Sequence, residues 1–188
     1  MSMHPELAWI AEARKHLGLT EIKGSKHNKT IITWLERLKA WWRDDETAWC
    51  GVFIAHCLAS AGMRRGKVNS RSKNWEGNKA PPNHYPYNWY GAIEYMKEGG
   101  TKLNKPCYGC VAVKTRKGGG HVAFVVGQTH SGMLVCLGGN QNNKVSYALY
   151  RPTDFEAFMW YGTTSSPASH RYDLPVLRGI TETSVSEA

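Results

Sequence analysis

The chain lacks several features that would assign it to a class at once. No apolar run approaches the roughly 18 residues that a spanning helix needs, so we expect no stable membrane insertion. The N-terminus lacks the basic-then-apolar pattern of a secretory signal, so we expect the protein to stay in the cytoplasm where it is made until another agent releases it. Five cysteines cannot pair completely, which argues against a disulfide framework and for reduced thiols.

Motifs for common cofactors are also missing. The chain contains no calcium-binding loop, P-loop or dinucleotide fingerprint. Cys107 and Cys110 have CxxC spacing, but no second pair follows at zinc-ribbon distance, and the motif leads into an expected strand rather than opening a helix. We therefore expect no metal and no cofactor at the functional site, and core positions for Cys57 and Cys136.

Positive charge is in excess, with a net charge of +9. Residues 163–188 hold two arginines against three carboxylates, so a net charge of −1 falls there and +10 on residues 1–162. The excess indicates an anionic partner, which can be nucleic acid, a membrane surface or an acidic wall polymer, or it serves solubility alone. Residues 163–188 are rich in Ser, Thr and Pro and predict a flexible or loosely docked tail on one domain formed by 1–162, which we expect to be a monomer.

The hydrophobic period changes once along the chain. Apolar residues recur at helical spacing in the first half and predict helices from 7 to 17, from the cap Asn28 to Trp42, from 49 to 61 and from 89 to 97. After Gly99 and Gly100 the period becomes two and predicts strands at 110–113, 121–126, 133–137, 144–150 and 155–161. Helices followed by an antiparallel meander indicate an α+β fold.

Cys50 is the most informative single residue. It follows a polar run and opens an apolar helical stretch, so its thiol is expected in the first turn of a helix. There the helix dipole and unpaired backbone N–H groups favour a thiolate and can stabilise an oxyanion beside it. An inert buried cysteine is the alternative.

His121 and Asn140 are candidates for the groups that would assist Cys50. His121 follows three glycines, which leave the approach to it open, and heads an apolar strand, so the imidazole is expected at the end of the sheet as a base. Asn140 ends the next strand and can hold the imidazole tautomer through its amide oxygen, with Gln141 as the alternative. The competing interpretations are an edge histidine and ordinary turn chemistry.

Three motifs in this order resemble a known family. Cys50 at the head of a helix, His121 in Gly-His-Val-Ala-Phe-Val-Val, and Asn140 in Leu-Gly-Gly-Asn-Gln look like the cysteine/histidine-dependent amidohydrolase/peptidase (CHAP) domains of the papain-like superfamily. Residues 18–28, 45–50 and 138–141 are similar to a subgroup found in phages and prophages of Gram-negative bacteria. The resemblance covers roughly residues 5–162 and implies a papain-like fold, with N-terminal helices packed on a C-terminal antiparallel sheet.

The resemblance implies cleavage of an amide bond in bacterial peptidoglycan through an acyl-enzyme. Cys50 corresponds to the nucleophile and His121 to the base, while Asn140 takes the orienting role because Gly138 replaces the glutamate of many relatives. The stretch Asp44-Asp45-Glu46 replaces the calcium-binding Asp-x-Asp of some relatives, so no calcium requirement is expected. The neighbouring residues are expected to shape the site or contact substrate, or in the case of the acids to cap the Cys50 helix: Asp45, Glu46, Trp49, Gly120 and Gln141.

Alternatives to a phage endolysin remain at this point. The same chemistry would serve a virion-borne lysin or a secreted antibacterial effector. A basic nucleic-acid-binding protein is the alternative from another class, and it would use the basic segment from Arg64 to Lys79 and the aromatic run at 85–90. No nucleic-acid-binding motif accompanies that segment, so we expect peptidoglycan, and not nucleic acid, as the partner.

Overall fold

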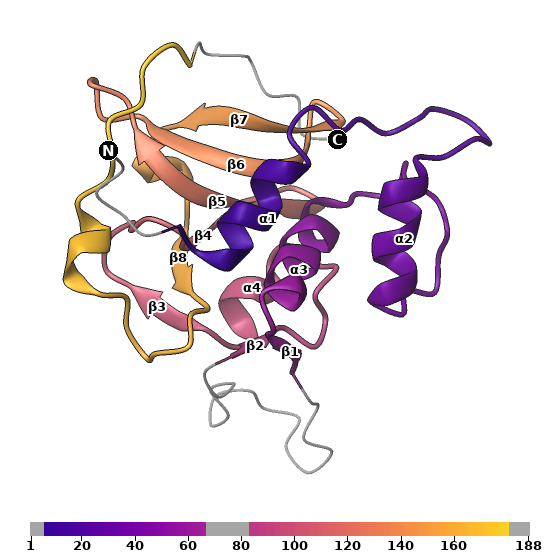
Figure 1. Cartoon of the computed structure of the whole chain (residues 1–188), viewed down its shortest axis with the longest axis horizontal. Coiled ribbons are helices and arrows are strands. Elements are labelled where there is room, and N and C mark those ends of the chain that lie inside the picture. The colour runs from indigo at the N-terminus through magenta and orange to yellow at the C-terminus, as the bar shows by residue number, and fades with distance from the viewer. Residues whose placement is uncertain (1–5, 67–82, 181–188) are drawn as a thin grey trace.

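A six-stranded antiparallel sheet lies at the centre of the structure, in the order β3–β8–β4–β5–β6–β7 (Figure 1). The computed structural model describes residues 6–66 and 83–180. The strands are Thr101–Leu103 (β3), Val111–Arg116 (β4), Gly119–Gln128 (β5), Leu134–Gln141 (β6), Lys144–Tyr150 (β7) and Ala157–Trp160 (β8). Helices precede the sheet in the chain, so the α+β class predicted from the sequence is confirmed.

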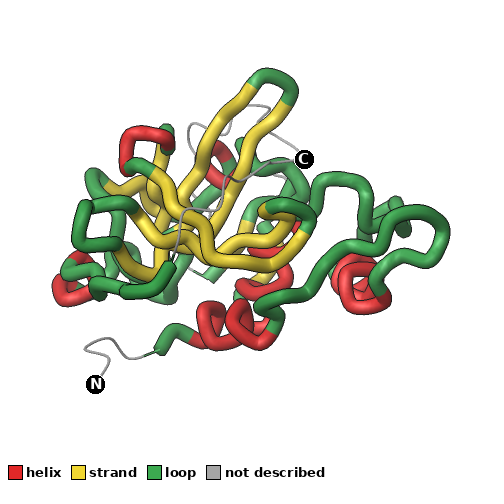
Figure 2. The backbone as a smooth tube through the Cα atoms, turned by 90° about the horizontal axis from the view of Figure 1, so that it is seen from above, coloured by secondary structure: helices red, strands yellow, loops and turns green. Residues whose placement is uncertain are grey.

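The helices lie around the sheet rather than on one side of it, as the view from above shows (Figure 2). They are Ala8–Lys15 (α1), Lys29–Arg37 (α2), Cys50–Ser60 (α3) and Glu94–Lys97 (α4), with 3₁₀ turns at Pro152–Asp154 (η2) and Ser169–Tyr172 (η3). Helices α1 and α3 lie against the sheet, whereas α2 lies farther out beside α3 (Figure 1). The longest of these helices, α3, has 11 residues, and no helix between 6 and 66 or between 83 and 180 is long and apolar enough to cross a bilayer.

Helix α2 begins where the sequence predicts and ends earlier. The side chain of Asn28 accepts a hydrogen bond from the backbone N–H of Thr30, which confirms the predicted cap. The prediction that the helix continues to Trp42 is wrong. Lys39 has a φ of +59°, and the N–H of Ala40 donates to the carbonyl of Leu35 at 2.8 Å, so a left-handed residue stops the helix.

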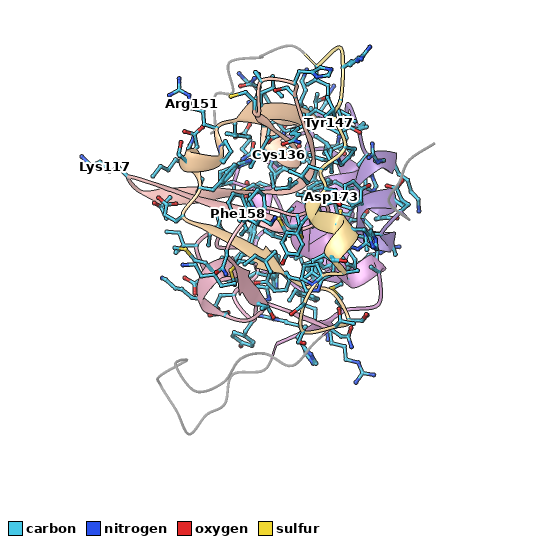
Figure 3. The ribbon with its side chains drawn as sticks, turned by 90° about the vertical axis from the view of Figure 1, so that its left-hand side faces the viewer. Lys117, Cys136, Tyr147, Arg151, Phe158 and Asp173 are labelled. Atoms are coloured by element: carbon cyan, nitrogen blue, oxygen red, sulfur yellow. The ribbon has the colours of Figure 1, made fainter. Side chains whose placement is uncertain are left out.

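The two hairpin turns that lie between the predicted strands, within residues 114–120 and 138–143, are shorter than those gaps. Several candidate site residues therefore lie in strands and not in loops. Strand β4 pairs with β5 up to Arg116 and Gly119, so the projecting hairpin turns at Lys117 and Gly118 alone (Figure 3). Strand β6 pairs with β7 up to Gln141, and Asn142 and Asn143 both have positive φ, as a two-residue hairpin turn requires. Gly120, Asn140 and Gln141 therefore lie within strands.

All five cysteines are buried, and none forms a disulfide. Burial raises the pKa of the Cys57, Cys110 and Cys136 thiols, which keeps these three protonated and inert. Cys136 is the third residue of β6, which lies between β5 and the edge strand β7 (Figure 3). The core positions expected for Cys57 and Cys136 are confirmed.

Two segments singled out in the sequence are described only in part. The short strands Arg64–Arg65 (β1) and His84–Tyr85 (β2) pair in parallel, and the rest of the basic segment up to Lys79 lies outside the described residues. The described part of the tail, residues 163–180, packs on the domain. The backbone of Gln128 donates to the carbonyl of Pro175 and accepts from the N–H of Leu177, and Leu174, Leu177 and Ile180 pack against the core.

Candidate functional site

Cys50 is the first residue of α3, and only 5% of its surface is exposed. The preceding residue, Trp49, occupies the cap position and makes no side-chain capping bond, and the first turn contains no acidic residue. The backbone N–H groups at the start of a helix and the positive end of its dipole favour negative charge. The position predicted for Cys50 is therefore confirmed, and this end of α3 suits a thiolate or an oxyanion.

His121 is the third residue of β5 and is 2% exposed. Its Nε2 atom lies 3.3 Å from the amide oxygen Oε1 of Gln141, and its ring stacks on Tyr150 with centroids 6.2 Å apart. An amide oxygen only accepts hydrogen bonds, so Nε2 of the imidazole must carry the proton. The basic lone pair of the neutral ring is then on Nδ1.

The amide of Gln141 is held in one orientation by further bonds. Its Nε2 donates to the carbonyl of Ser146 at 2.6 Å and to that of Gly138 at 3.4 Å. Its Oε1 accepts a second hydrogen bond, from the hydroxyl of Tyr150 at 3.2 Å. Since both carbonyls require a donor, the amide cannot turn over, and the His121 tautomer is fixed through it.

The orienting contact expected of Asn140 is therefore made by Gln141. Asn140 is buried with a φ of +57°, and the pairing of β6 with β7 shifts register between Gly138 and Gln141. This bulge turns the Asn140 side chain away from the position that an unbroken strand would give it. The Oδ1 atom of Asn140 has no hydrogen-bond partner among the described residues.

The start of α3 and the start of β5 rest on the same short segment, residues 89–93. A methyl group on Gly51 would lie 2.7 Å from the carbonyl oxygens of both Trp89 and Tyr90, and one on Gly120 would lie 3.4 Å from Cβ of Ala92. The hydroxyl of Tyr95 adds a 2.8 Å hydrogen bond to the carbonyl of Gly51. Cys50 and His121, each next to one of these glycines, are therefore brought to one region.

Strand β6 reaches the same region through a third glycine. A methyl group on Gly139 would lie 2.6 Å from Cβ of Phe53 and 2.7 Å from the ring of Trp49. The structure shows close packing at Trp49 and Gly120, and the site-shaping role expected of them stays a prediction. Trp49 supplies a surface for β6, and Gly120 leaves room for the segment beside it.

Asp45 and Glu46 bind the backbone of the loop that precedes α2. Asp45 is fully buried and accepts hydrogen bonds from the N–H groups of Ile22 and Asn28 and from Nδ1 of His27, while Glu46 accepts from the N–H of Gly24. Burial opposes ionisation of Asp45, but these donors outweigh it and lower its pKa. The acids hold the loop and do not cap α3, so that part of the expectation is wrong. Two of the motifs that carry the family resemblance, 18–28 and 45–50, are bound to each other.

An aromatic pocket adjoins the start of α3 and was not identified from the sequence. Its volume is about 300 Å³, and it is lined by Trp41, Trp42, Thr47, Ala48 and Tyr90. Trp41 is 73% exposed, and its ring lies 4.7 Å from that of Tyr90. The buried indole N–H of Trp42 finds no acceptor within the described part of the chain. The sequence predicts Trp42 as the last residue of a helix, and that prediction gives no sign that its ring lines a pocket.

Comparisons with known proteins add no relative. No protein-family model matches the chain, and neither the curated proteins nor the solved structures contain a significant match.

Proposed function

We propose that this chain is a peptidoglycan hydrolase of the CHAP type, with a papain-like fold, that cleaves an amide bond by cysteine nucleophilic catalysis. It would be an amidase or an endopeptidase. The observation that carries the proposal is the bond between His121 and Gln141, in a region that also holds the first turn of α3 with Cys50. An imidazole with a fixed tautomer near a thiol at a helix N-terminus is the arrangement that acyl transfer needs.

The proposed reaction begins with proton transfer from the Cys50 thiol to Nδ1 of His121. The thiolate sulfur then bonds to the carbonyl carbon of the scissile amide, and the backbone N–H groups at the start of α3 stabilise the oxyanion. His121 gives the proton to the amine nitrogen as the carbon–nitrogen bond breaks, which leaves a thioester on Cys50. Water, deprotonated by His121, hydrolyses the thioester and restores the thiol.

The aromatic pocket is the proposed binding site for the wall polymer beside the scissile bond. Ala48 lines it, two residues before Cys50, and so does Tyr90, whose carbonyl lies against Gly51. Aromatic faces accept the apolar faces of sugar rings, and the exposed ring of Trp41 offers such a face. The charge of +10 on residues 1–162 fits an anionic envelope.

A phage endolysin is the proposed setting, with the enzyme held in the host cytoplasm until it is released to the wall. A virion-borne lysin or a delivered antibacterial effector would use the same residues. Genomic neighbours, such as a holin or a secretion apparatus, distinguish these settings.

The test uses purified chain and isolated sacculi from a Gram-negative bacterium. We expect release of soluble fragments with new amino groups, and loss of at least about a hundredfold in rate for Cys50→Ser and His121→Ala. The exposed His130 offers a matched control, since His130→Ala should retain the wild-type rate. Mass spectrometry of the fragments identifies the bond that is cut.

Two results would refute the proposal. One is an unchanged rate in Cys50→Ser with a native thermal unfolding curve. The other is inert sacculi together with tight, strongly salt-dependent binding to DNA or RNA, which would favour a nucleic-acid-binding protein instead.

A further inference from the structure

Three side chains that play no part in the proposed reaction converge between α1 and α3. Glu12 lies in α1, His16 caps its C-terminal end, and His56 is the seventh residue of α3. The Oε1 atom of Glu12 lies 3.2 Å from Nε2 of His16 and 3.2 Å from Nε2 of His56. All three atoms lie within 4.8 Å of one another.

This spacing matches the ligand shell of a small transition-metal ion. Zinc binds imidazole nitrogen and carboxylate oxygen at about 2.0–2.2 Å, so two ligands of a tetrahedral ion lie about 3.3 Å apart. Both distances from Glu12 have nearly this value. Small side-chain rotations would bring the two imidazoles to the same spacing.

Two of the three side chains have shifted pKa values in the cluster. A hydrogen bond from Lys15, together with those from the histidines, outweighs burial and lowers the pKa of Glu12 to about 2. Burial lowers the pKa of His56 to about 4. Glu12 is therefore a carboxylate and His56 a neutral imidazole at neutral pH, and a metal at Nε2 of His56 would take the place of the proton that this atom donates to Glu12.

Neighbouring groups orient the three donors. Lys15 binds the other carboxylate oxygen of Glu12 at 2.7 Å, which leaves Oε1 for the histidines. The ring of Trp34 stacks on His56 and meets His16 edge-on, each with centroids 4.8 Å apart. Such contacts hold ligands in place before a metal arrives and strengthen its binding.

A cavity of about 270 Å³ borders His56. It is lined by Arg37, Leu38, His56, Ala59, Ser60 and Tyr85. Of the three donors, His56 is the one that borders this cavity.

We propose that Glu12, His16 and His56 form a metal-binding site, best suited to zinc, that joins α1 to α3. Two imidazoles and one carboxylate match the ligand preference of zinc, with cobalt and nickel as its chemical substitutes. The site is structural, because it fastens the helix that carries Cys50 at a point two turns from the thiol. It does not depend on the proposed hydrolase activity.

The test measures metal binding by the full chain with Cys50→Ala, in which the candidate nucleophile cannot bind zinc. After chelator treatment and removal of the chelator, calorimetric titration with Zn²⁺ should give one site per chain. Zinc at about 100-fold above its dissociation constant should raise the thermal unfolding midpoint by about 5–10 °C. Cobalt should produce visible absorption bands typical of nitrogen and oxygen ligands.

Variants in the same background separate this site from adventitious binding at other histidines. His16→Ala and Glu12→Gln should each weaken zinc binding at least about a hundredfold, and His130→Ala should leave it unchanged. His56→Gln, which removes the proposed ligand on α3, should weaken zinc binding in the same way. Absence of stoichiometric zinc binding, or binding that survives both His16→Ala and Glu12→Gln, would overturn the proposal. In either case Glu12 is only a hydrogen-bonded bridge between two histidines.

Discussion

The Nε2 atom of His121 lies 3.3 Å from the amide oxygen of Gln141. Gln141 is itself held by Ser146 and Tyr150, so the imidazole is oriented by a side chain that has little freedom to move. The sequence presents Asn140 and Gln141 as alternatives for orienting His121, and the structure gives this contact to Gln141.

Gln141→Ala should lower kcat at least about tenfold, because the neutral imidazole loses the acceptor that keeps its proton on Nε2. Asn140→Ala should have a smaller effect on kcat, since its Oδ1 atom makes no hydrogen bond to His121. Steady-state rates on soluble wall fragments measure both. The opposite ranking, with both variants folded, would return the orienting role to Asn140.

Gly120→Ala should destabilise the fold by about 1–3 kcal/mol and reduce activity. The added methyl would lie 2.6 Å from the backbone oxygen of Lys114 and press against residues 92–93. Gly119→Ala is the matched control in the same strand, because a methyl there meets no atom within 4 Å. Urea unfolding and rates of wall solubilisation check the pair, and equal stabilities would contradict the close packing at Gly120.

Trp41→Ala should raise KM by about three- to tenfold and leave kcat and stability nearly unchanged. The ring is exposed and lines the pocket, so its loss removes contact area for the substrate without opening the core. Leu17→Ala, at another exposed apolar side chain, serves as the control. A fall in kcat without a change in KM would show that the pocket is not a substrate-binding surface.

Acid should destabilise the metal-free protein in two stages. The pKa of His56 is about 4 in the fold against an ordinary 6.5, so the unfolded chain takes up a proton first, and stability falls as the pH drops from 6.5 to 4. The pKa of Glu12 is lowered from 4.5 to about 2, so its contribution is lost as the pH falls below 4.5 towards 2. Urea unfolding at several pH values should show a flatter curve between 4 and 6.5 for His56→Gln than for the wild type. Parallel curves would contradict this assignment.

The sequence predicts elements whose determinants are local. Asn28 signals the start of α2 because its side chain caps the next turn, and the change of period after Gly100 marks the passage from helices to sheet. The position of Cys50 at the start of α3 is also predicted from its neighbours in the sequence. In each case a few neighbouring residues carry the whole signal.

What the sequence misses depends on conformation or on distance along the chain. The end of α2 at Arg37 depends on a left-handed Lys39, and lysine carries no signal for that conformation. Gln141, and not Asn140, contacts His121 because a bulge in β6 changes which of the two side chains faces the imidazole. Glu12 and His56 are 44 positions apart and meet only because α1 packs on α3.

The contacts of Gly51 and Gly120 with residues 89–93 make this segment a spacer between the helix end that carries Cys50 and the strand end that carries His121. On the Cys50 side the spacing is set by the thickness of the main chain itself, through the carbonyls of Trp89 and Tyr90. On the His121 side it is set by the side chains of Ile93 and Ala92. A substitution at Trp89 or Tyr90 changes neither carbonyl, whereas a one-residue deletion in this segment changes both contacts. In directed evolution of this protein, length in the segment should therefore be held constant while its outward-facing side chains are varied.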